Sequence, residues 1–322
     1  MNVPVLERSI VVLGEVLVDL FVKQDKPRAG VSFTCTGLPG GAPGNVAVHL
    51  ARRGLPVQLV TAFGDDGFGE ALQQFLRDRG VGLDFAVCGE MSSTPLAAVY
   101  QNAAGYTEFR IYMEGTALSH LTPEAVAAAC EHCMGWFHFG SVLMSLGNAR
   151  ALTTWFVQKA ADNGAVVTYD INIRPNIIAV GSEAARDVVG ILSHVDILKI
   201  SDDDFAWIKH GMLPGLQSPR DFLNYGCKLV AWTHGPNGAT LLTKDASCFV
   251  APPQVEPVDT TGAGDGFTAG LIQYFWERKV STKEQLSSAL DEGSSLLTEA
   301  GEYAAAIAGD VISRVGALPG GR

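Results

Sequence analysis

Long apolar runs, clustered cysteines and a basic leader are all missing from this sequence of 322 residues. No apolar run approaches the roughly 18 residues that a membrane-spanning helix needs, and Met1–Ser9 lacks the basic-then-apolar order of a secretion signal. The six cysteines are scattered, at positions 35, 88, 130, 133, 227 and 248, unlike a secreted disulfide framework. We therefore expect a reduced, cytoplasmic protein that does not associate with a membrane.

Positive charge is also scarce in this chain. Lysine and arginine number 23 against 34 aspartates and glutamates, which gives a formal net charge of -11. A nucleic acid or an anionic membrane surface would repel such a chain, so neither is an expected partner. Hydrophobic residues make up 47% and charged residues 18%, as in an ordinary globular core. An anionic ligand would then have to bind at local positive ends.

Two nucleotide-binding fingerprints are absent as well. No Gly-Lys-Ser/Thr follows a glycine-rich loop, so the chain has no Walker A motif. The chain also lacks Gly-x-Gly-x-x-Gly, the fingerprint of dinucleotide-binding folds. The second absence disfavours a nucleotide-dependent oxidoreductase, and any phosphate-binding loop must have another form.

The apolar pattern alternates between strands and helices. Five runs look like buried strands: Ile10–Asp19, Val57–Phe63, Ala165–Ile171, Asp196–Ile200 and Lys228–Trp232. Helical patterns follow most of them, at Asn45–Arg53, Gly69–Arg79, Pro123–Met134 and Ala149–Asn163. This alternation predicts right-handed βαβ crossovers and a mainly parallel sheet that helices cover on both faces.

One region breaks this alternation. Pro95–Gln101 and Tyr106–Met113 flank Asn102–Gly105 and read as a β-hairpin, and Leu17–Lys23 and Val31–Cys35 supply further strands. Because these strands lie outside the main sheet, we expect a small β-sheet lid. The lid strands would be inserted at about residues 16–36 and 95–115 of a single domain that comprises residues 1–322.

A glycine-rich turn before an apolar helix carries the chemistry. The stretch from Val258 to Gly270 contains Gly262-Ala263-Gly264-Asp265. A turn that opens a helix presents unpaired N–H groups and the positive end of the helix dipole to an anion. Small residues let a phosphate approach the backbone closely. Asp265, in the first helical turn, would face the same place, where phosphoryl transfer needs a base directed at the attacking hydroxyl.

A second glycine-rich element lies upstream, at Gly40-Gly41-Ala42-Pro43-Gly44-Asn45. Gly40 and Gly41 would let the backbone approach a polyol, while Asn45 offers a donor and an acceptor to paired hydroxyls. Taken alone, the element is better explained as a turn with Asn45 as the N-cap of the following helix. Asp19 ends the first predicted strand, where ligand crevices of α/β folds lie, and suits hydrogen bonding to sugar hydroxyls.

Both glycine-rich elements resemble the two signatures of the ribokinase (PfkB) family of carbohydrate kinases. Gly40–Asn45 is similar to the first signature, and Asp259–Gly270 matches the second nearly letter for letter. Gly14–Asp19, Gly40–Val48 and His138–Ser141 most resemble the fructokinases of the family. The resemblance implies a three-layer α/β/α, Rossmann-like (ribokinase-like) domain whose β-sheet lid closes over the sugar and excludes water.

The resemblance also implies roles for individual residues. Asp265 would be the catalytic base, and Gly262, Ala263 and Gly264 would form the anion hole. Asp19, Gly40, Gly41 and Asn45 would contact the sugar. The nucleotide would contact the turn that contains Thr233, Gly235 and Gly238, and the planar guanidinium of Arg174 would reach phosphate.

Cofactors and assembly follow from the same resemblance. Family members use Mg²⁺ with ATP, and many are activated by K⁺ near the start of the second signature, where Asp259 and Thr261 are the candidates. Many dimerise through the lid, so a homodimer is the assembly to test. The usual Asn-x-x-Glu near the metal and phosphate reads Ser201-Asp-Asp-Asp204 here, and Asp204 would order the metal through water. In the lid, Arg110 is the candidate cation for the acceptor.

The sequence thus predicts an ATP-dependent sugar kinase that converts D-fructose to fructose 6-phosphate. The departures in the lid keep other acceptors open: 2-keto-3-deoxygluconate, aminoimidazole riboside and ribose. A different class, a catalytically silent sugar sensor on the same fold, is disfavoured because Asp265 and its glycine loop are intact.

Overall fold

The computed structural model describes residues 9–25, 32–101, 107–132 and 135–318. Its central element is an eight-stranded sheet in the order β14-β13-β12-β11-β10-β9-β1-β4. The strands from β4 to β12 are parallel, and β13 and β14 continue the sheet in antiparallel pairs. The strands of this sheet are β1 (Ile10–Leu13), β4 (Val57–Val60), β9 (Trp136–Gly140), β10 (Val166–Asp170), β11 (Ile197–Ser201), β12 (Leu229–Thr233), β13 (Ala239–Leu242) and β14 (Ser247–Val250).

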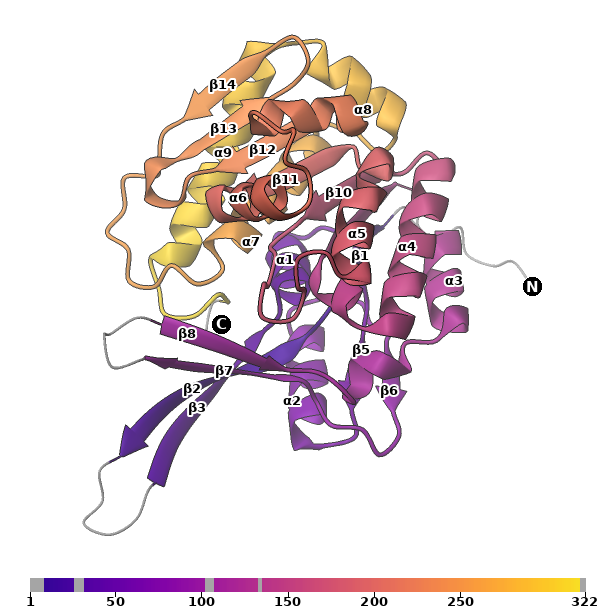
Figure 1. Cartoon of the computed structure of the whole chain (residues 1–322), viewed down its shortest axis with the longest axis vertical. Coiled ribbons are helices and arrows are strands. Elements are labelled where there is room, and N and C mark those ends of the chain that lie inside the picture. The colour runs from indigo at the N-terminus through magenta and orange to yellow at the C-terminus, as the bar shows by residue number, and fades with distance from the viewer. Residues whose placement is uncertain (1–8, 26–31, 102–106, 133–134, 319–322) are drawn as a thin grey trace.

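Two hydrophobic cores lie on the two faces of this sheet. Successive residues of β1 point to opposite faces, so Val11 and Leu13 join one core while Ile10 and Val12 join the other. Four helices contribute to the first core: α3 (Pro123–His132), α4 (Gly147–Asp162), α5 (Glu183–Gly190) and α6 (Asp202–Gly211). Five helices contribute to the second: α1 (Ala42–Ala51), α2 (Gly67–Arg77), α7 (Ala263–Glu277), α8 (Lys283–Leu290) and α9 (Ser294–Ile312). The predicted three-layer α/β/α domain is confirmed (Figure 1).

A second sheet of four strands projects from the main body (Figure 1). Its order is β3-β2-β7-β8, formed by β2 (Leu17–Asp25), β3 (Ser32–Gly40), β7 (Leu96–Gln101) and β8 (Thr107–Tyr112). This is the predicted lid, although its second strand runs on to Gly40 and not only to about residue 36. A two-stranded sheet of β5 (Ala62–Gly64) and β6 (Val87–Gly89) lies beside the main sheet. The predicted turn Asn102–Gly105 lies outside the described residues, as do Cys133 and Met134.

The structure corrects two expectations about local elements and adds one strand. Ile10–Asp19 is not one strand, because the chain leaves the main sheet after Leu13 and enters the lid at Leu17. Helix α1 begins at Ala42 with Gly41 as its N-cap, so Asn45 lies inside the helix. Pro43 near the helix start explains the earlier beginning, since its fixed φ suits the first helical turn. The sequence analysis also missed β9, whose five residues are all buried between β1 and β10.

Candidate active site

The candidate site lies where three neighbouring parallel strands end. Asp170, Ser201 and Thr233 are the last residues of β10, β11 and β12. The N-terminus of α7 meets the same edge and, together with Ser201 and Thr233, borders a cavity of about 650 Å³ that extends to the lid. A volume of this size suits a small ligand, and the carboxyl edge of a parallel sheet is the usual place for one.

The glycine-rich turn opens α7 as predicted. Gly262 is the N-cap of α7, with a left-handed φ of 79° that favours glycine. A Cβ at Gly262 would lie 2.5 Å from the Cβ of Ala317, so a side chain has no room there. Gly262, Ala263 and Gly264 all line the cavity. The first N–H groups of a helix have no partner within the helix. The N–H of Ala263 donates to the backbone oxygen of Thr260 over 3.3 Å, and the turn offers the following N–H groups to an anion in the cavity.

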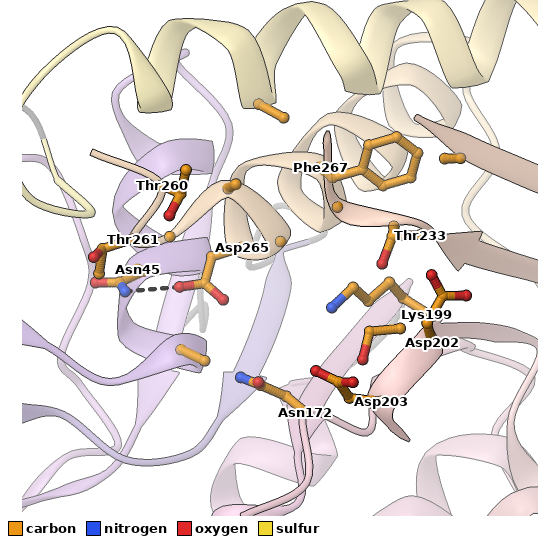
Figure 2. A pocket seen from close by; sticks show the side chains of 18 of the residues that line it. Asn45, Asn172, Lys199, Asp202, Asp203, Thr233, Thr260, Thr261, Asp265 and Phe267 are labelled. Atoms are coloured by element: carbon orange, nitrogen blue, oxygen red, sulfur yellow. Dashed lines mark hydrogen bonds between the residues drawn. The ribbon is translucent and has the colours of Figure 1, made fainter. Parts of the chain in front are cut away.

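Asp265 lies in the first turn of α7 and faces helix α1. The Asn45 side chain donates a hydrogen bond of 2.8 Å from its amide to Asp265 Oδ2, as Figure 2 shows. Burial raises the pKa of Asp265 to about 6, against the opposing effect of the bond from Asn45. A carboxylate with such a pKa is ionised near neutral pH and is basic enough to accept a proton from a hydroxyl.

A buried ion pair beneath the turn was missed by the sequence analysis. Lys199 Nζ lies 3.1 Å from Asp170 Oδ1, and both side chains are less than a tenth exposed. The Thr268 hydroxyl of α7 donates to Asp170 Oδ2 over 3.3 Å. Lys199 also lies 3.0 Å from where a Cβ of Gly264 would be, so its ammonium is next to the glycine turn. A lysine within the apolar strand Ile197–Ser201 was the signal available in the sequence, since buried lysines need a partner.

The lid supplies the wall opposite α7. Leu17 and Asp19 of β2, Ala97 of β7, and Phe109 and Ile111 of β8 line the cavity, so one face of the lid covers it. Burial is the main cause that raises the pKa of Asp19 to about 6, and the nearby charge of Asp265 adds to this effect. Gly40 does not line the cavity, but a Cβ there would lie 2.1 Å from Asp19 Oδ2. Gly40 therefore leaves room for the Asp19 carboxylate.

Arg110 does not have the predicted place. It lies on β8 between Phe109 and Ile111, which face the cavity, and successive strand residues point to opposite faces. Arg110 is exposed and is not among the residues that border the cavity. The structure therefore does not support Arg110 as a contact of the acceptor, and the alternation along β8 is the physical reason.

The far half of the cavity is formed by the ends of β11 and β12. Thr233, Gly235 and Gly238 line it, together with His234. His234 Nδ1 lies 3.0 Å from an oxygen of Asp202, and its Nε2 lies 3.0 Å from the Thr240 hydroxyl. These contacts fix the turn that the sequence analysis assigned to the nucleotide, and Figure 2 shows Thr233, Asp202 and Lys199 on this side.

Arg174 also lines the cavity. Its guanidinium donates to the backbone oxygen and the side-chain oxygen of Asn172, at 3.0 and 2.6 Å. Asn172 has a left-handed φ of 41°, and these bonds accompany that unusual backbone conformation. The guanidinium is thereby oriented at the cavity border, where its remaining N–H groups suit an anion.

Asp204 has a structural place that differs from the predicted one. Its carboxylate accepts hydrogen bonds from the N–H and hydroxyl of Ser201 and from the N–H of Ile173. Ser201 and Asp204 form the capping box at the start of α6, and Asp204 is buried outside the cavity. Asp204 Oδ2 is thus committed to this cap, and Oδ1 is committed to the Ile173 N–H. Its neighbours Asp202 and Asp203 line the cavity instead, along with Ser201.

The candidates for K⁺ are divided between two environments. Thr261 borders the cavity, whereas Asp259 does not. The Asp259 carboxylate accepts one hydrogen bond from the N–H of Thr261 and another from the N–H of Gly316, each of 2.9 Å. Partial burial opposes ionisation, but these bonds outweigh it and lower the pKa of Asp259. Among the described residues, no group of three or more His, Cys, Asp or Glu side chains could hold a metal ion.

Comparison with known proteins identifies the family. The sequence profile of the pfkB family of carbohydrate kinases matches residues 7–320. The chain belongs to this family. It is 32% identical to Fructokinase-2 of Oryza sativa subsp. japonica over 82% of its own length and 78% of that protein. It is 31% identical to Fructokinase-1 of the same plant, over 96% and 93% of the two chains.

Solved structures agree with this membership. The structure of fructokinase with bound ATP from Xylella fastidiosa matches with a TM-score of 0.85 and 25% identity, over 97% of this chain and 94% of the other. The protein is therefore a PfkB carbohydrate kinase, a phosphotransferase that uses ATP and a sugar. No helix in the described part of this kinase has the length and apolar character to cross a membrane.

Most of the predicted site residues come together in the cavity of this kinase. Only Gly40, Arg110, Asp204 and Asp259 do not line it. Among the other residues that line the cavity are two groups that the sequence analysis did not assign, charged side chains and apolar lid residues. The first group is Glu15, Lys199, Asp202 and Asp203, and the second is Leu17, Ala97, Phe109 and Ile111.

Proposed function

We propose that this kinase transfers the γ-phosphoryl group of ATP to the primary hydroxyl of D-fructose. The observation that carries the proposal is the position of Asp265. It lies at the N-terminus of α7, bonded to Asn45, between the glycine turn and the lid. The fructokinases among the similar proteins support fructose as the acceptor.

The proposed step is an in-line displacement at the γ-phosphorus. Asp265 accepts the proton of the sugar hydroxyl while that oxygen bonds to the γ-phosphorus. The bond from the γ-phosphorus to the bridging oxygen breaks, and ADP leaves with the electron pair. The N–H groups of the Gly262–Gly264 turn and the ammonium of Lys199 neutralise the group in transfer. Positioning and electrostatics supply most of the rate in such reactions.

Lys199 meets the requirement for local positive charge in this acidic protein. It is buried, so water and salt screen its charge weakly. Its pairing with Asp170 outweighs desolvation and raises its pKa, so the ammonium stays charged at neutral pH. We propose that ATP phosphate joins Asp170 around this ammonium when the nucleotide binds.

The residues at the nucleotide side fit Mg²⁺, which we propose as the cofactor. Mg²⁺ is commonly held by one or two carboxylates together with substrate phosphates and water. Asp202 and Asp203 present such carboxylates at the cavity, on the first turn of α6. Bound there, Mg²⁺ would neutralise phosphate charge. A monovalent cation such as K⁺ remains a proposal for the segment of Asp259 and Thr261.

The acceptor side favours an uncharged sugar. The carboxyls of Glu15, Asp19 and Asp265 all line this part of the cavity, and Arg110 is not there to compensate an acid. Arg174 lines the cavity too, but we assign the N–H groups that remain after its bonds to Asn172 to the phosphate of ATP. This arrangement disfavours 2-keto-3-deoxygluconate, whose carboxylate would meet like charges. Aminoimidazole riboside and ribose are uncharged at these positions and remain the alternatives to fructose.

A coupled assay of ADP release tests the proposal. The panel holds fructose, ribose, 2-keto-3-deoxygluconate, aminoimidazole riboside and nucleosides, with Mg·ATP, with and without K⁺. We expect turnover with fructose, and the Asp265→Asn variant should keep its fold and bind ATP but lose turnover by about 10²- to 10⁴-fold. Near-normal turnover in that variant would contradict the role of Asp265. ATP binding without turnover on any sugar would favour the silent sugar sensor.

We also propose a homodimer formed through the outer face of the lid, in the cytoplasm. Phe33, Tyr100 and Tyr112 lie on the lid face opposite Asp19 and are 61%, 38% and 59% exposed. Exposed aromatic side chains on one face of a sheet are candidates for an interaction surface. The cysteines that the structure describes are all free, which suits a reducing compartment. Light scattering of the purified chain, with Tyr112→Ser as the variant, tests the assembly.

A further inference from the structure

Glu15 occupies the hinge between the two sheets of the molecule. It lies in the segment Gly14–Val16, which joins β1 of the main sheet to β2 of the lid. The residue is 3% exposed and borders the cavity. A carboxyl group is rarely buried to this extent without a partner or a function.

Glu15 is bonded to the start of helix α1. The N–H of Ala42, the first residue of α1, donates to Glu15 Oε1 over 3.2 Å. One turn further along α1, Asn45 donates to Asp265 Oδ2 over 2.8 Å. A continuous path of one helical turn and two hydrogen bonds therefore runs from the lid hinge to the catalytic base (Figure 2 shows its last step).

The hinge and the start of α1 are interlocked by close backbone approaches. A Cβ at Gly14 would lie 2.2 Å from Pro43, and one at Gly41 would lie 2.5 Å from the backbone oxygen of Glu15. A Cβ at Gly44 would lie 2.9 Å from Val16. Packed interfaces this tight do not deform continuously. Movement of the hinge would therefore be transmitted to α1 rather than absorbed between them.

Two buried oxygens along this path lack hydrogen-bond donors within the described part of the chain. They are Glu15 Oε2 and Asn45 Oδ1. An unsatisfied buried acceptor costs about 1–3 kcal/mol, and a proton on Glu15 would convert one of these acceptors into a donor. Burial raises the pKa of Glu15 to about 7, so the protonated form is populated near neutral pH. The charged groups that border the same cavity are Asp19, Asp265, Lys199, Asp202, Asp203 and Arg174, and Asp170 pairs with Lys199.

From this geometry we infer that Glu15 is a positioning residue for the base. It acts through Ala42 and Asn45 to hold Asp265, and it ties the position of Asp265 to that of the lid. The inference rests on the proposed function only in taking Asp265 as the base. A change in lid position moves the Gly14–Val16 segment, and the bond to Ala42 passes this movement to α1.

The test compares Glu15→Gln with Glu15→Ala in steady-state kinetics across pH. Glutamine keeps an oxygen for the Ala42 N–H and adds an amide donor, whereas alanine removes the acceptor. We expect Glu15→Ala to lose about ten- to a hundredfold in kcat, as small misplacements of reacting groups do, with the KM for ATP unchanged. Glu15→Gln should recover most of that loss. Between about pH 6 and 8, where Asp265 is ionised and Glu15 titrates, kcat should change with pH in the unmodified enzyme and stay flat in Glu15→Gln.

The matched control is Glu124→Gln, which removes one exposed carboxylate on α3. The pH profile of this control variant should match that of the unmodified enzyme. A purely structural Glu15 would lower Tm in Glu15→Ala while kcat and the pH profiles of both variants stayed unchanged, and this result would overturn the inference. If Glu15→Ala does not fold, the pH profile of Glu15→Gln decides alone. The assay uses whichever sugar the unmodified enzyme phosphorylates, so failure with fructose overturns the proposed acceptor and leaves the Glu15 result interpretable.

Discussion

The Lys199–Asp170 pair offers a quantitative test of how this kinase combines stability with phosphate binding. The two side chains are 7% and 4% exposed, and their charged atoms lie 3.1 Å apart beneath the glycine turn. We consider Lys199→Met, Asp170→Asn and the double variant. Methionine and asparagine keep most of the side-chain volume, so the packing of β10 and β11 changes little.

The expected magnitudes follow from what each variant leaves behind. Lys199→Met leaves the Asp170 carboxylate buried with only the Thr268 hydroxyl as its hydrogen-bond donor on α7. Breaking a buried ion pair on one side costs about 3–5 kcal/mol in the free energy of unfolding, whereas replacing both partners is often close to neutral. The double variant should therefore be more stable than Lys199→Met. Burial raises the pKa of Asp170, so the penalty of Lys199→Met should shrink as pH falls and Asp170 becomes protonated.

Urea unfolding and ADP release separate the two roles. The double variant, although folded, should lose about 10²- to 10³-fold in kcat, the usual cost of removing one donor to a charged transition state. Lys228→Met is the matched control, because Lys228 pairs with Asp196 at 3.2 Å on the same sheet but is 28% exposed and does not line the cavity. It should keep full turnover. A stable double variant with full turnover would refute the catalytic role of Lys199, and a cost below about 1 kcal/mol for Lys199→Met would refute the buried pair.

Two further predictions concern the acidic residues of the site. Asp265 must be ionised to accept a proton, and its pKa is about 6. We therefore expect kcat/KM to fall about tenfold per pH unit below pH 6 and to level off above pH 6. A profile of kcat/KM that stays flat down to pH 5 would contradict this role of Asp265. Asp203→Asn should raise the Mg²⁺ concentration needed for the half-maximal rate and leave Tm unchanged, because Asp203 lines the cavity. Asp204→Asn should instead lower Tm, because it removes the capping box of α6, and should leave the Mg²⁺ requirement unchanged. The reverse result would restore Asp204 as the residue near the metal.

The sequence was sufficient for the architecture and for the centre of the site because both depend on local patterns. Apolar runs of strand length alternated with helical patterns, and glycines before an apolar helix predicted the turn at Gly262. Asp265 then followed from its place in the first turn of α7. The break between β1 and β2 could not be predicted in the same way. Ile10–Asp19 is apolar except at Gly14, Glu15 and Asp19, and only the arrangement of two sheets in space shows that the chain changes sheet at Gly14.

The errors at the site have a common origin in side-chain direction. Arg110 and Phe109 are neighbours in sequence, but the alternation along β8 sends them to opposite faces of the lid. Asp203 and Asp204 are neighbours too, yet the second is consumed by the capping box while the first lines the cavity. The place of Lys199 in an apolar strand indicates burial, but its partner, 29 residues away on β10, cannot be identified from the sequence. A motif gives the position of a residue, and tertiary structure gives its orientation.

The net charge of -11 leads to a last prediction, about salt. The field of the whole protein repels ATP, while the groups proposed to attract it are local: buried Lys199, Arg174 and the first N–H groups of α7. Salt screens the long-range repulsion between exposed charges more than the short-range attraction within a buried site. Raising choline chloride from about 50 to about 200 mM, across which the Debye length falls below about 10 Å, should therefore leave the KM for ATP unchanged or lower it. A KM that rises several-fold over this range would show that exposed cations, and not the buried Lys199, dominate nucleotide binding.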